Sequence, residues 1–421
     1  MPHYRRMAAF GTVTLALALA ALPSACGDSP TTPAIVHLPR SLTAGEQQLV
    51  AADNSFAFKL FRAIASRANP DSNLFVSPVS VGMALGMSVN GAAGETRDSM
   101  LRALDLTGLS MSEVNLGYRG VIDLLRGLDG SVEFTLANSL WVRTGLTVEQ
   151  EFLGNLRTYF DADARTLDFA APGAAGTINA WVSEQTRGRI PEIVNDPIPG
   201  EVVAYLINAI YFKGSWTQRF DAALTHAAPF NLRGGGAVSA SMMQHRDPAP
   251  ARYYSGDGVT VVDLPYGGRA WSMTIVLPGA AGGIDSLVAG LTQARWDAWM
   301  AGLDTMGVVV TMPKFTLRYD LLLNDVLASL GMGIAFCSSG AADFTNLVAA
   351  PDNVCITSVK HRTFVDVYEE GTEAAAVTAV EFGRAATPQH VTVDRPFLVA
   401  IRERLSGTVL FLGRVTNPAA S

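Results

Sequence analysis

Apolar residues recur at helical spacing near the start of the chain. The stretch 45–68 places its large apolar side chains on one face of a helix. Ser77 and Pro78 mark the start of a second helix, because serine caps helix N-termini and proline suits the first turn. This second helix, over residues 79–89, is apolar nearly all round, which predicts that it is buried. The apolar positions of the first helix are Leu49, Phe56, Leu60, Phe61 and Ile64.

Strands dominate the later part of the chain. Residues 134–142 alternate like a half-buried strand, whereas 202–212 form a continuous apolar run, as expected for a strand buried on both faces. A helix over 321–330 is predicted to end at Gly331. Early helices and late strands indicate an α+β fold with large, mostly antiparallel sheets. Further strands are predicted over 261–277, with a hairpin turn at 266–268, and over 308–317, 355–367 and 391–415.

The composition favours one large domain. Hydrophobic residues make up 49% of the 421 residues and charged residues 16%, and no linker-like segment interrupts the chain after residue 45. The net charge of −7 argues against a nucleic-acid partner, because acidic proteins do not compensate phosphate charge. No dense basic stripe appears in the sequence. A polyanionic glycosaminoglycan would need such a stripe to bind, so the sequence does not support activation of the protein by a glycosaminoglycan.

The first 25 residues have the pattern of a secretory signal. Arg5 and Arg6 precede an apolar run over 7–22, and small residues follow before Cys26. The apolar run is short for a membrane-spanning helix. Cys26 follows Ser24-Ala25 as in a lipobox, the motif in which bacterial lipoproteins are acylated on cysteine.

Two interpretations of Cys26 remain open. The leucine of the lipobox stands one place too early, at Leu22, so ordinary cleavage beside an unmodified cysteine is the alternative. We favour the lipoprotein because the polar residues after Cys26 suit a flexible tether to an anchored domain. The expected organisation is a signal over 1–25, a tether over 26–45 and one domain over 46–421. The protein is then membrane-anchored, facing the periplasm or the cell surface, or is secreted.

The stretch 368–396 combines two kinds of segment. Its first half is made of small and β-branched residues, and side chains such as Val377 and Thr378 favour a strand. Its second half is polar around Arg384, a suitable bait for a protease. A segment that can become a strand is therefore joined to a segment that a protease would cut.

This stretch resembles the hinge and reactive-centre loop of the serpins. Other segments resemble motifs of that family and occur in the expected order from about residue 49 to residue 418. Because they span nearly the whole mature chain, the resemblance extends to the complete fold. These segments are 73–80 (NLFVSPVS), 208–216 (NAIYFKGSW), 312–315 (MPKF), 394–398 (DRPFL) and 411–418 (FLGRVTNP).

The resemblance implies an inhibitor of serine proteases rather than an enzyme. In the serpin fold, helices pack around large β-sheets, and cleavage of an exposed loop lets its hinge enter the main sheet. Alternate hinge residues from Thr372 to Thr378 are small, and a strand's period of two turns them toward the interior. We expect a monomer whose partners are serine proteases. The hinge comprises Glu370, Gly371, Thr372, Glu373, Ala374, Ala375, Ala376, Val377 and Thr378.

The reactive bond is ambiguous by one residue. The family's usual spacing from the hinge indicates Ala385–Ala386, which suits elastase-like or subtilisin-like enzymes. A loop one residue shorter places the cut at Arg384–Ala385, which suits trypsin-like enzymes because their pocket aspartate pairs with arginine. A charge paired in a desolvated pocket favours the second bond slightly.

Five further residues match serpin positions that control opening of the sheet. By resemblance, Ser77, Ser80, Asn208 and His361 match the shutter, and Trp216 matches the breach where the hinge enters. Each residue also has a purely structural interpretation, such as a helix start for the serines or a satisfied core histidine for His361.

Other chemistry has little support in the sequence. We find no nucleophile elbow, HExxH helix, P-loop or dinucleotide-binding glycine motif, and we expect no metal and no cofactor. Cys337 and Cys355 lack metal-ligand spacing, which leaves free buried thiols or a disulfide between them. The alternative function is a non-inhibitory serpin that serves as a surface binding protein or carrier; an enzyme is less favoured still.

Overall fold

The computed structural model describes residues 1, 3, 34–372 and 387–420. The chain divides into units of residues 1–30 and 31–421, and the second unit carries the fold. Residues 34–43, expected at the end of a tether, belong to this second unit and make contacts within it. The backbone nitrogen of Ile35 donates to the carbonyl of Gly268 (2.7 Å), and Arg40 pairs with Glu46 (2.6 Å).

Two of the longest described helices begin at capping residues that the sequence supplies. Thr43 caps α1 through a reciprocal capping box with Glu46, and Ser110 caps α4 in the same way with Glu113. No described helix has the length and apolar character that crossing a membrane requires. The α-helices are α1 (Ala44–Ala65), α2 (Pro78–Gly91), α3 (Gly94–Ala103), α4 (Met111–Leu125), α5 (Gln150–Phe160), α6 (Ala174–Gln185), α7 (Gly283–Ala289), α8 (Gln293–Ala301) and α9 (Asn324–Leu327).

The larger of two sheets has ten strands and is mostly antiparallel. Its order is β1-β16-β15-β9-β8-β7-β10-β6-β5, and β14 pairs with β10 in parallel. The hairpin turn predicted at 266–268 joins β8 to β9. The strands are β1 (Leu74–Val76), β5 (His226–Asn231), β6 (Ala237–Gln244), β7 (Ala249–Gly256), β8 (Val259–Tyr266), β9 (Trp271–Pro278), β10 (Asp304–Pro313), β14 (Gln389–Thr392), β15 (Phe397–Glu403) and β16 (Val409–Val415).

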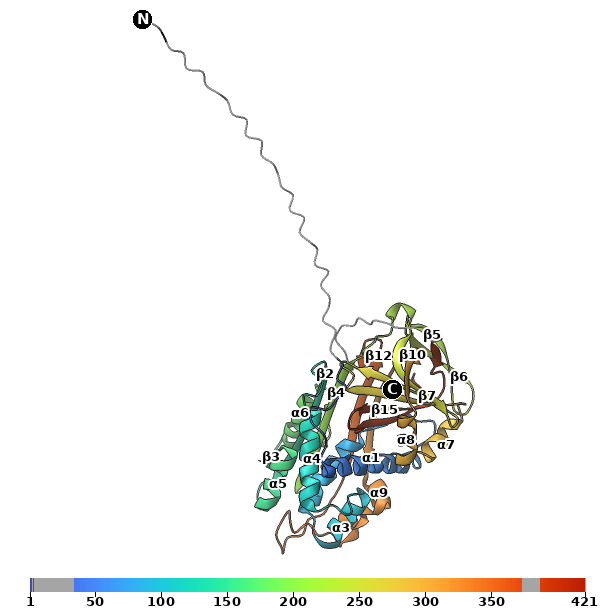
Figure 1. Cartoon of the computed structure of the whole chain (residues 1–421). Helices are drawn as coiled ribbons and strands as arrows, with labels where there is room; N and C mark the ends of the chain where they lie inside the picture. Colours follow the sequence, from blue (N-terminus) through green and yellow to red (C-terminus); the bar gives the residue numbers. More distant parts are fainter. Residues whose placement is uncertain (2, 4–33, 373–386, 421) are drawn as a thin grey trace. The chain divides into compact units, whose positions relative to one another are not determined.

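The second sheet has six strands in the order β11-β12-β13-β4-β2-β3. In Figure 1, α4, α5 and α6 lie beside β2, β3 and β4, and β5, β6 and β7 of the larger sheet lie on the opposite side of the molecule. The predicted α+β fold with large, mostly antiparallel sheets is confirmed. The strands of this sheet are β2 (Val132–Arg143), β3 (Ala162–Leu167), β4 (Ala204–Ser215), β11 (Phe315–Leu322), β12 (Lys360–Tyr368) and β13 (Gly371–Thr372).

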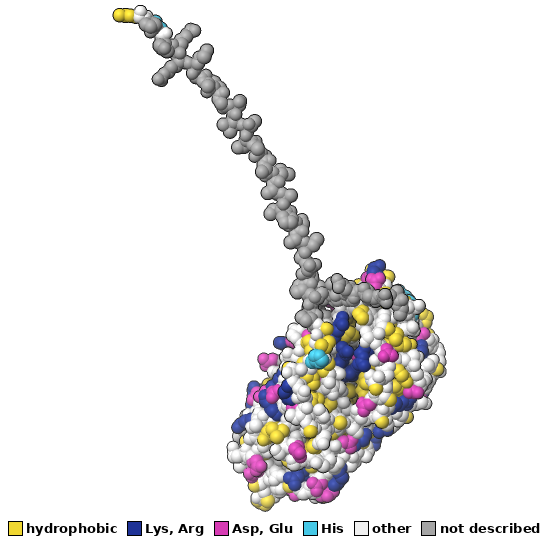
Figure 2. All heavy atoms as spheres, in the orientation of Figure 1, with side chains coloured by type: hydrophobic (Ala, Val, Ile, Leu, Met, Phe, Trp, Pro, Cys, Tyr) yellow, Lys and Arg dark blue, Asp and Glu magenta, His cyan; other side chains and the backbone are white. Residues whose placement is uncertain are grey.

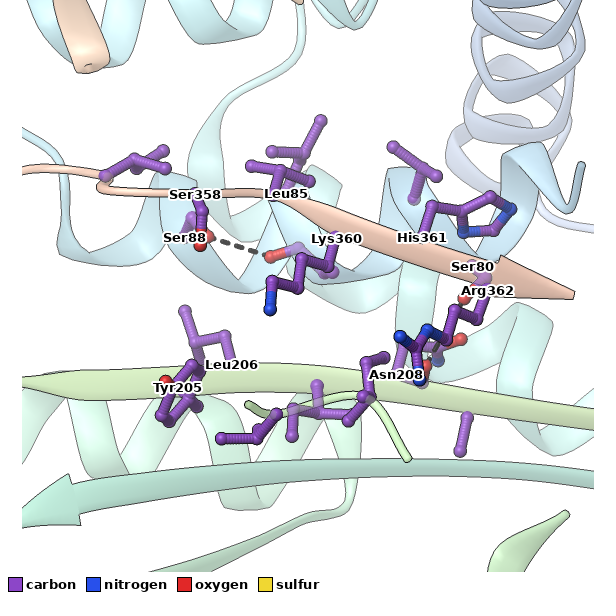
Figure 3. A pocket seen from close by; sticks show the side chains of 18 of the residues that line it. Ser80, Leu85, Ser88, Tyr205, Leu206, Asn208, Ser358, Lys360, His361 and Arg362 are labelled. Carbon is purple, nitrogen blue, oxygen red and sulfur yellow. Dashed lines mark hydrogen bonds between the residues drawn. The ribbon is translucent and has the colours of Figure 1, made fainter. Parts of the chain in front are cut away.

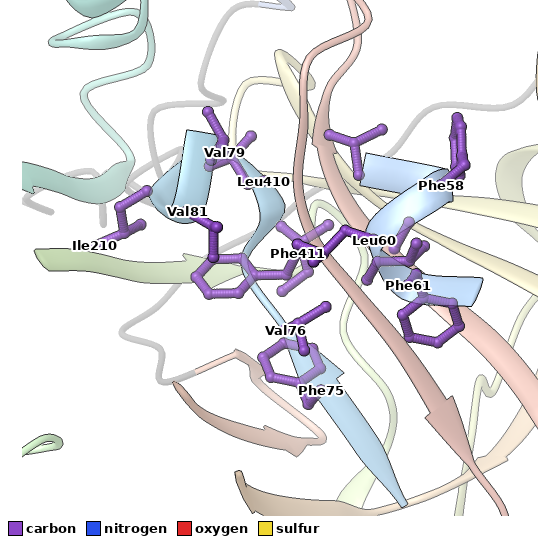
Figure 4. Close-up of a cluster of buried hydrophobic side chains, with 14 of the residues drawn as sticks. Phe58, Leu60, Phe61, Phe75, Val76, Val79, Val81, Ile210, Leu410 and Phe411 are labelled. Carbon is purple, nitrogen blue, oxygen red and sulfur yellow. The ribbon is translucent and has the colours of Figure 1, made fainter. Parts of the chain in front are cut away.

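Helix α2 connects the two sheets through the core. Every residue of α2 except Ala84 is buried, as its all-round apolar sequence predicts. The helix packs against both β4 and β16. Figure 4 shows Val81 near Ile210 of β4 and Phe411 of β16, and Phe411 stacks on Phe75 with ring centres 5.2 Å apart. One hydrophobic core is therefore continuous beneath both sheets.

Two predictions about single elements were wrong. The run 202–212 is not buried on both faces throughout, because the first three residues of β4, Ala204 to Leu206, are partly exposed. The helix expected over 321–330 begins later, since Leu321 and Leu322 extend β11; α9 starts at Asn324 and continues directly as a π-helical segment, Ala328–Met332. Gly331 does adopt the positive φ of a helix terminator (107°).

Charged side chains of both signs are scattered over the visible face of the molecule, among polar and hydrophobic atoms (Figure 2). Figure 2 shows Lys and Arg interspersed with Asp and Glu over most of that face. Several charged residues of the domain form pairs. Arg119 bonds Asp123 along α4 (2.5 Å), and Arg233 bridges Asp71 and Asp285 (2.7 and 2.9 Å). Such exposed pairs each contribute little to stability.

A carboxyl group is buried among α1, α2 and α4. Asp53 is 6% exposed, and burial raises its pKa to about 7. The Tyr118 hydroxyl lies 3.2 Å from Asp53 Oδ1 and 3.1 Å from the carbonyl of Gly82. A protonated Asp53 can donate to the Tyr118 oxygen, and Tyr118 can then donate to Gly82. This arrangement satisfies every group when Asp53 is neutral.

Asp53 should therefore make folding stability depend on pH. Its pKa is higher in the folded chain than in the unfolded chain, so the folded state loses stability as pH rises from about 4 to about 7, by up to about 4 kcal/mol. Asp53→Asn keeps the shape and a donor but removes the titration. We expect the variant to be more stable than the parent at pH 8 and to lose this slope, measured as urea midpoints from pH 4 to pH 8. An unchanged slope would place the titration elsewhere.

Candidate functional site

The six-stranded sheet is open between β4 and β12 in the described part of the chain. Among the described residues, only the two residues of β13 lie between these strands: Thr372 is opposite Val367 of β12 and Gly214 of β4. Beyond Thr372, residues 204–213 of β4 and 360–366 of β12 have no ladder between them in the described part of the chain. We call this space the slot. A strand fits between them because β4 and β12 are both antiparallel to β13.

A cavity occupies the part of the slot that lies farthest from β13. Its volume is about 180 Å³, and it is bounded by residues 203–210 on one side and 354–364 on the other. Figure 3 shows Tyr205 and Leu206 on β4 across from Ser358, Lys360 and Arg362, with the α2 residues that include Ser80 and Ser88 behind them. The interior of the sheet therefore contains a void that a further strand could fill.

The entrance to the slot is built around Trp216. Its indole Nε1 donates to the carbonyl of Tyr368 (2.9 Å), and its backbone nitrogen donates to that of Glu370 (3.0 Å). Tyr266 stacks on the indole at 4.5 Å, and its hydroxyl lies 2.7 Å from Thr372 Oγ1. Thr372 is 3% exposed, so its side chain faces the core, as the strand period predicts. These contacts hold the first hinge residues at the entrance.

Glu369 and Lys314 add an ion pair at the same entrance. Their side chains meet at 2.9 Å, and Thr225 donates a further hydrogen bond to Glu369 (2.7 Å). Burial alone would raise the pKa of Glu369, but the hydrogen bonds from Thr225 and Lys314 outweigh burial and lower the pKa. Sequence reasoning assigned neither residue a role, because the partners are 55 positions apart.

Ser77 and His361 meet beneath the middle of the sheet. The backbone nitrogen of Ser77 donates to His361 Nε2 (2.9 Å), and the Ser77 hydroxyl donates to the carbonyl of Leu410 (2.8 Å). Ser77 occupies the N-cap position of α2, but its side chain does not cap the helix, contrary to expectation. Burial lowers the pKa of His361 to about 4, so the ring is neutral and accepts the hydrogen bond.

Asn208 links this region to the neighbouring strand. Its amide donates to Asn138 Oδ1 on β2 (2.8 Å), and Asn138 donates to the carbonyl of Phe160 (2.7 Å). Ser80 makes a long hydrogen bond to the backbone oxygen of Asn208 (3.4 Å). The buried Asn208 Oδ1 has no partner among the described residues. Asn138 was missed from sequence, although a polar residue inside an apolar strand was a usable signal.

Several predicted site residues cannot be placed. Cys26, the hinge residues from 373 to 378 and the bait residues Arg384, Ala385 and Ala386 lie outside the described residues. Of the predicted hinge, Glu370 is exposed, whereas Gly371 and Thr372 form β13 and are buried.

The two described cysteines form a disulfide. Cys337 and Cys355 are bonded, which resolves the alternative between free thiols and a bridge. Across the described residues, no group of three or more His, Cys, Asp or Glu side chains is arranged to hold a metal ion.

Comparisons with known proteins agree on one family. The sequence profile of the family Serpin (serine protease inhibitor) matches residues 51–418. The chain is 35% identical to the leukocyte elastase inhibitor of Bos taurus, over 88% of this chain and 100% of that protein. It is 32% identical to Iripin-1 of Ixodes ricinus, over 92% and 99% of the two chains.

Solved structures show the same architecture. Human thyroxine-binding globulin in complex with its hormone aligns with a TM-score of 0.79 at 27% identity, covering 89% of this chain and 100% of that one. The thermophilic serpin Tengpin in its native state aligns with a TM-score of 0.78 at 27% identity, covering 92% and 97%.

The entrance ion pair generates a prediction. Glu369→Lys places a second ammonium group beside Lys314 in a largely buried position, which we expect to lower the unfolding free energy by about 2 kcal/mol. The matched control is Glu370→Lys, the same charge change at the exposed neighbour. Urea unfolding of both variants measures the difference. Equal effects at the two positions would mean that the Glu369–Lys314 pair does not stabilise the entrance.

Proposed function

The chain belongs to the serpin family, and from this membership we propose that it inhibits serine endopeptidases as a suicide substrate. The observation that carries the proposal is the slot, which already holds Gly371 and Thr372 at its entrance. In the proposed mechanism, cleavage of the reactive loop lets the rest of the hinge follow these two residues into the sheet.

The register at the entrance sets the register of the proposed insert. Continuing the ladder one residue at a time brings Ala374 opposite Val365 and Phe212, and Thr378 opposite His361 and Asn208. Residues at even positions share the inward face of Thr372, and all of them as far as Thr378 are small. Thr378 would thus arrive beside the unpartnered Asn208 Oδ1.

The proposed insertion is strongly downhill. Around a dozen new strand residues, at roughly 0.5–1.5 kcal/mol net per hydrogen bond, give on the order of 10 kcal/mol. Filling the cavity adds apolar contacts. A gain of this size is comparable with the whole stability of a domain, so the uncut chain is held in its open state by a kinetic barrier.

Trapping is a competition between insertion and deacylation. The protease serine attacks the scissile carbonyl, the peptide bond breaks, and the carbonyl carbon stays esterified to the enzyme. Thirteen steps of about 3.4 Å, from Gly371 to Arg384, carry that ester about 44 Å. Deacylation needs the protease's oxyanion hole and triad in close alignment, so pulling the enzyme against the inhibitor stops it.

The target class follows from which bond is cut. Cleavage at Arg384–Ala385 suits trypsin-like enzymes, and cleavage at Ala385–Ala386 suits elastase-like or subtilisin-like ones. The 35% identity to an elastase inhibitor supports the second class. The mass of the C-terminal peptide released on cleavage distinguishes them, since it begins at Ala385 in one case and at Ala386 in the other.

A non-inhibitory binding protein is the second candidate. The alignment with thyroxine-binding globulin in complex with its hormone shows that a binding protein can have this fold. The small, uncharged hinge favours inhibition, because a carrier has no need of a segment that fits inside a sheet. A chain that is cut by proteases of all three classes without forming an adduct would support the carrier.

We place the protein outside the cytosol, anchored through Cys26. The apolar run over 7–22 and the small residues before Cys26 support export and lipid attachment. Cys26→Ser removes the thiol that would be acylated. We expect the variant to move from the membrane fraction to the soluble fraction, and unchanged fractionation would contradict the anchor.

Thr372→Arg tests the insertion mechanism. Thr372 is buried against Tyr266, so an arginine must either bury its charge without a partner or hold the hinge out of the sheet. The bait is unchanged, and the protease should still acylate. We expect cleaved inhibitor in place of the covalent adduct that the parent forms, seen as bands on a denaturing gel.

The matched control is Glu370→Arg, which adds the same side chain at an exposed position two residues away. This variant should form adduct as the parent does. If Thr372→Arg also yields as much adduct as the parent, cut at the same bond, hinge insertion is not the trap.

A further inference from the structure

The cavity has a second edge that does not belong to the sheet. Residues 354–359 precede β12 and border the cavity together with Lys360. Continuing the entrance register along this edge brings loop residues 380–384 opposite residues 359–355. The last residues to enter before the reactive bond would therefore dock on this segment, which we call the terminal edge.

The terminal edge is held by isolated contacts, because the ladder between β11 and β12 ends at Leu322 and Lys360. The Asn324 side chain accepts from the backbone nitrogen of Val359 (2.9 Å) and donates to the carbonyl of Thr357 (2.8 Å). Ile356 makes a single bridge to Phe336. Apart from the main chain, one covalent bond joins this edge to the body of the domain, the disulfide from Cys355 to Cys337.

The position of Cys355 makes this bond important for the cavity. Cys355 itself lines the cavity, whose other wall is β4. A void next to a segment without a ladder tends to collapse, since atoms that line a void lack contacts on one side. The disulfide opposes that collapse because it fixes one end of the terminal edge to residues 335–337, to which Ile356 is also bonded.

We propose that the Cys337–Cys355 disulfide keeps the terminal edge in place to receive residues 380–384, and so determines whether insertion is completed. The inference rests on the proposed function. Without the bond, the edge moves into the cavity and the last steps of insertion slow. Deacylation keeps its own rate, so more inhibitor is released as cleaved product.

The test compares the full-length chain with its Cys337→Ala/Cys355→Ala variant. We expect the ratio of cleaved inhibitor to adduct to rise about threefold or more, because a small rise in a barrier slows a step exponentially. The increase in melting temperature on loop cleavage should also shrink, since the final strand residues dock poorly. The matched control is Ser110→Ala, which removes the cap of α4 and lowers stability without touching the cavity.

The outcomes distinguish a failure of the proposed inhibitory function from a failure of the inference about the disulfide. If the parent forms no adduct with any serine protease, the proposed function fails. If the parent forms adduct and the double variant traps equally well, or if Ser110→Ala shifts the ratio as much, the inference about the disulfide is wrong and the function stands.

If the double variant does not fold, the inference is tested by reducing the disulfide in the folded parent instead. The folded parent is treated with a small dithiol, which reduces the disulfide to two thiols and is itself oxidised to a cyclic disulfide. The same rise in cleaved product is expected with a protease that stays active in the dithiol. An unchanged ratio with the bond shown to be reduced overturns the inference.

Discussion

The structure depends on the missing pairing between β4 and β12. Both strands have partners on their outer sides, β2 for β4 and β11 for β12, and of the residues that the structure describes only Gly371 and Thr372 fill the space between them. Backbone groups in the middle of a sheet normally pair. In the proposed mechanism, the unpaired edges of β4 and β12 in the described part of the chain are the reason why the uncut fold is not at its free-energy minimum. Polar contacts lie at the entrance of the slot and beneath its middle, and in the proposed mechanism they keep this state from relaxing at once.

These contacts differ in kind. At the entrance, charged and aromatic groups hold the hinge: Glu369 pairs with Lys314, and Trp216 bonds the backbone on either side of Glu369. Under the middle of the slot, the contacts are neutral, because His361 is uncharged and bonds Ser77. A neutral hydrogen bond is weaker than a charge-assisted one, so it can be broken and re-formed as the strands part. This arrangement suits the proposed mechanism, in which the sheet stays closed for long periods and opens once.

Much of this fold could be predicted from the sequence, because local patterns determine it. The apolar sequence of α2 predicted its burial, and the turn at 266–268 predicted the hairpin. Pairings between distant residues could not be predicted. Nothing near Ser77 indicates that its hydroxyl bonds Leu410 rather than capping α2, and nothing near residue 202 indicates that β4 borders a void. The family resemblance supplied roles for Asn208 and Trp216 but gave no indication of Asn138, whose amide bonds Asn208.

The melting temperature before and after cleavage of the loop tests the metastable slot most directly. If the slot accepts residues 373–384 as a new strand, cutting the chain between 384 and 386 should raise the midpoint by about 10 °C or more, because on the order of 10 kcal/mol is gained. Cutting a chain normally lowers stability. A midpoint that is unchanged or lower after complete cleavage would contradict insertion and leave the opening between β4 and β12 without a mechanical role.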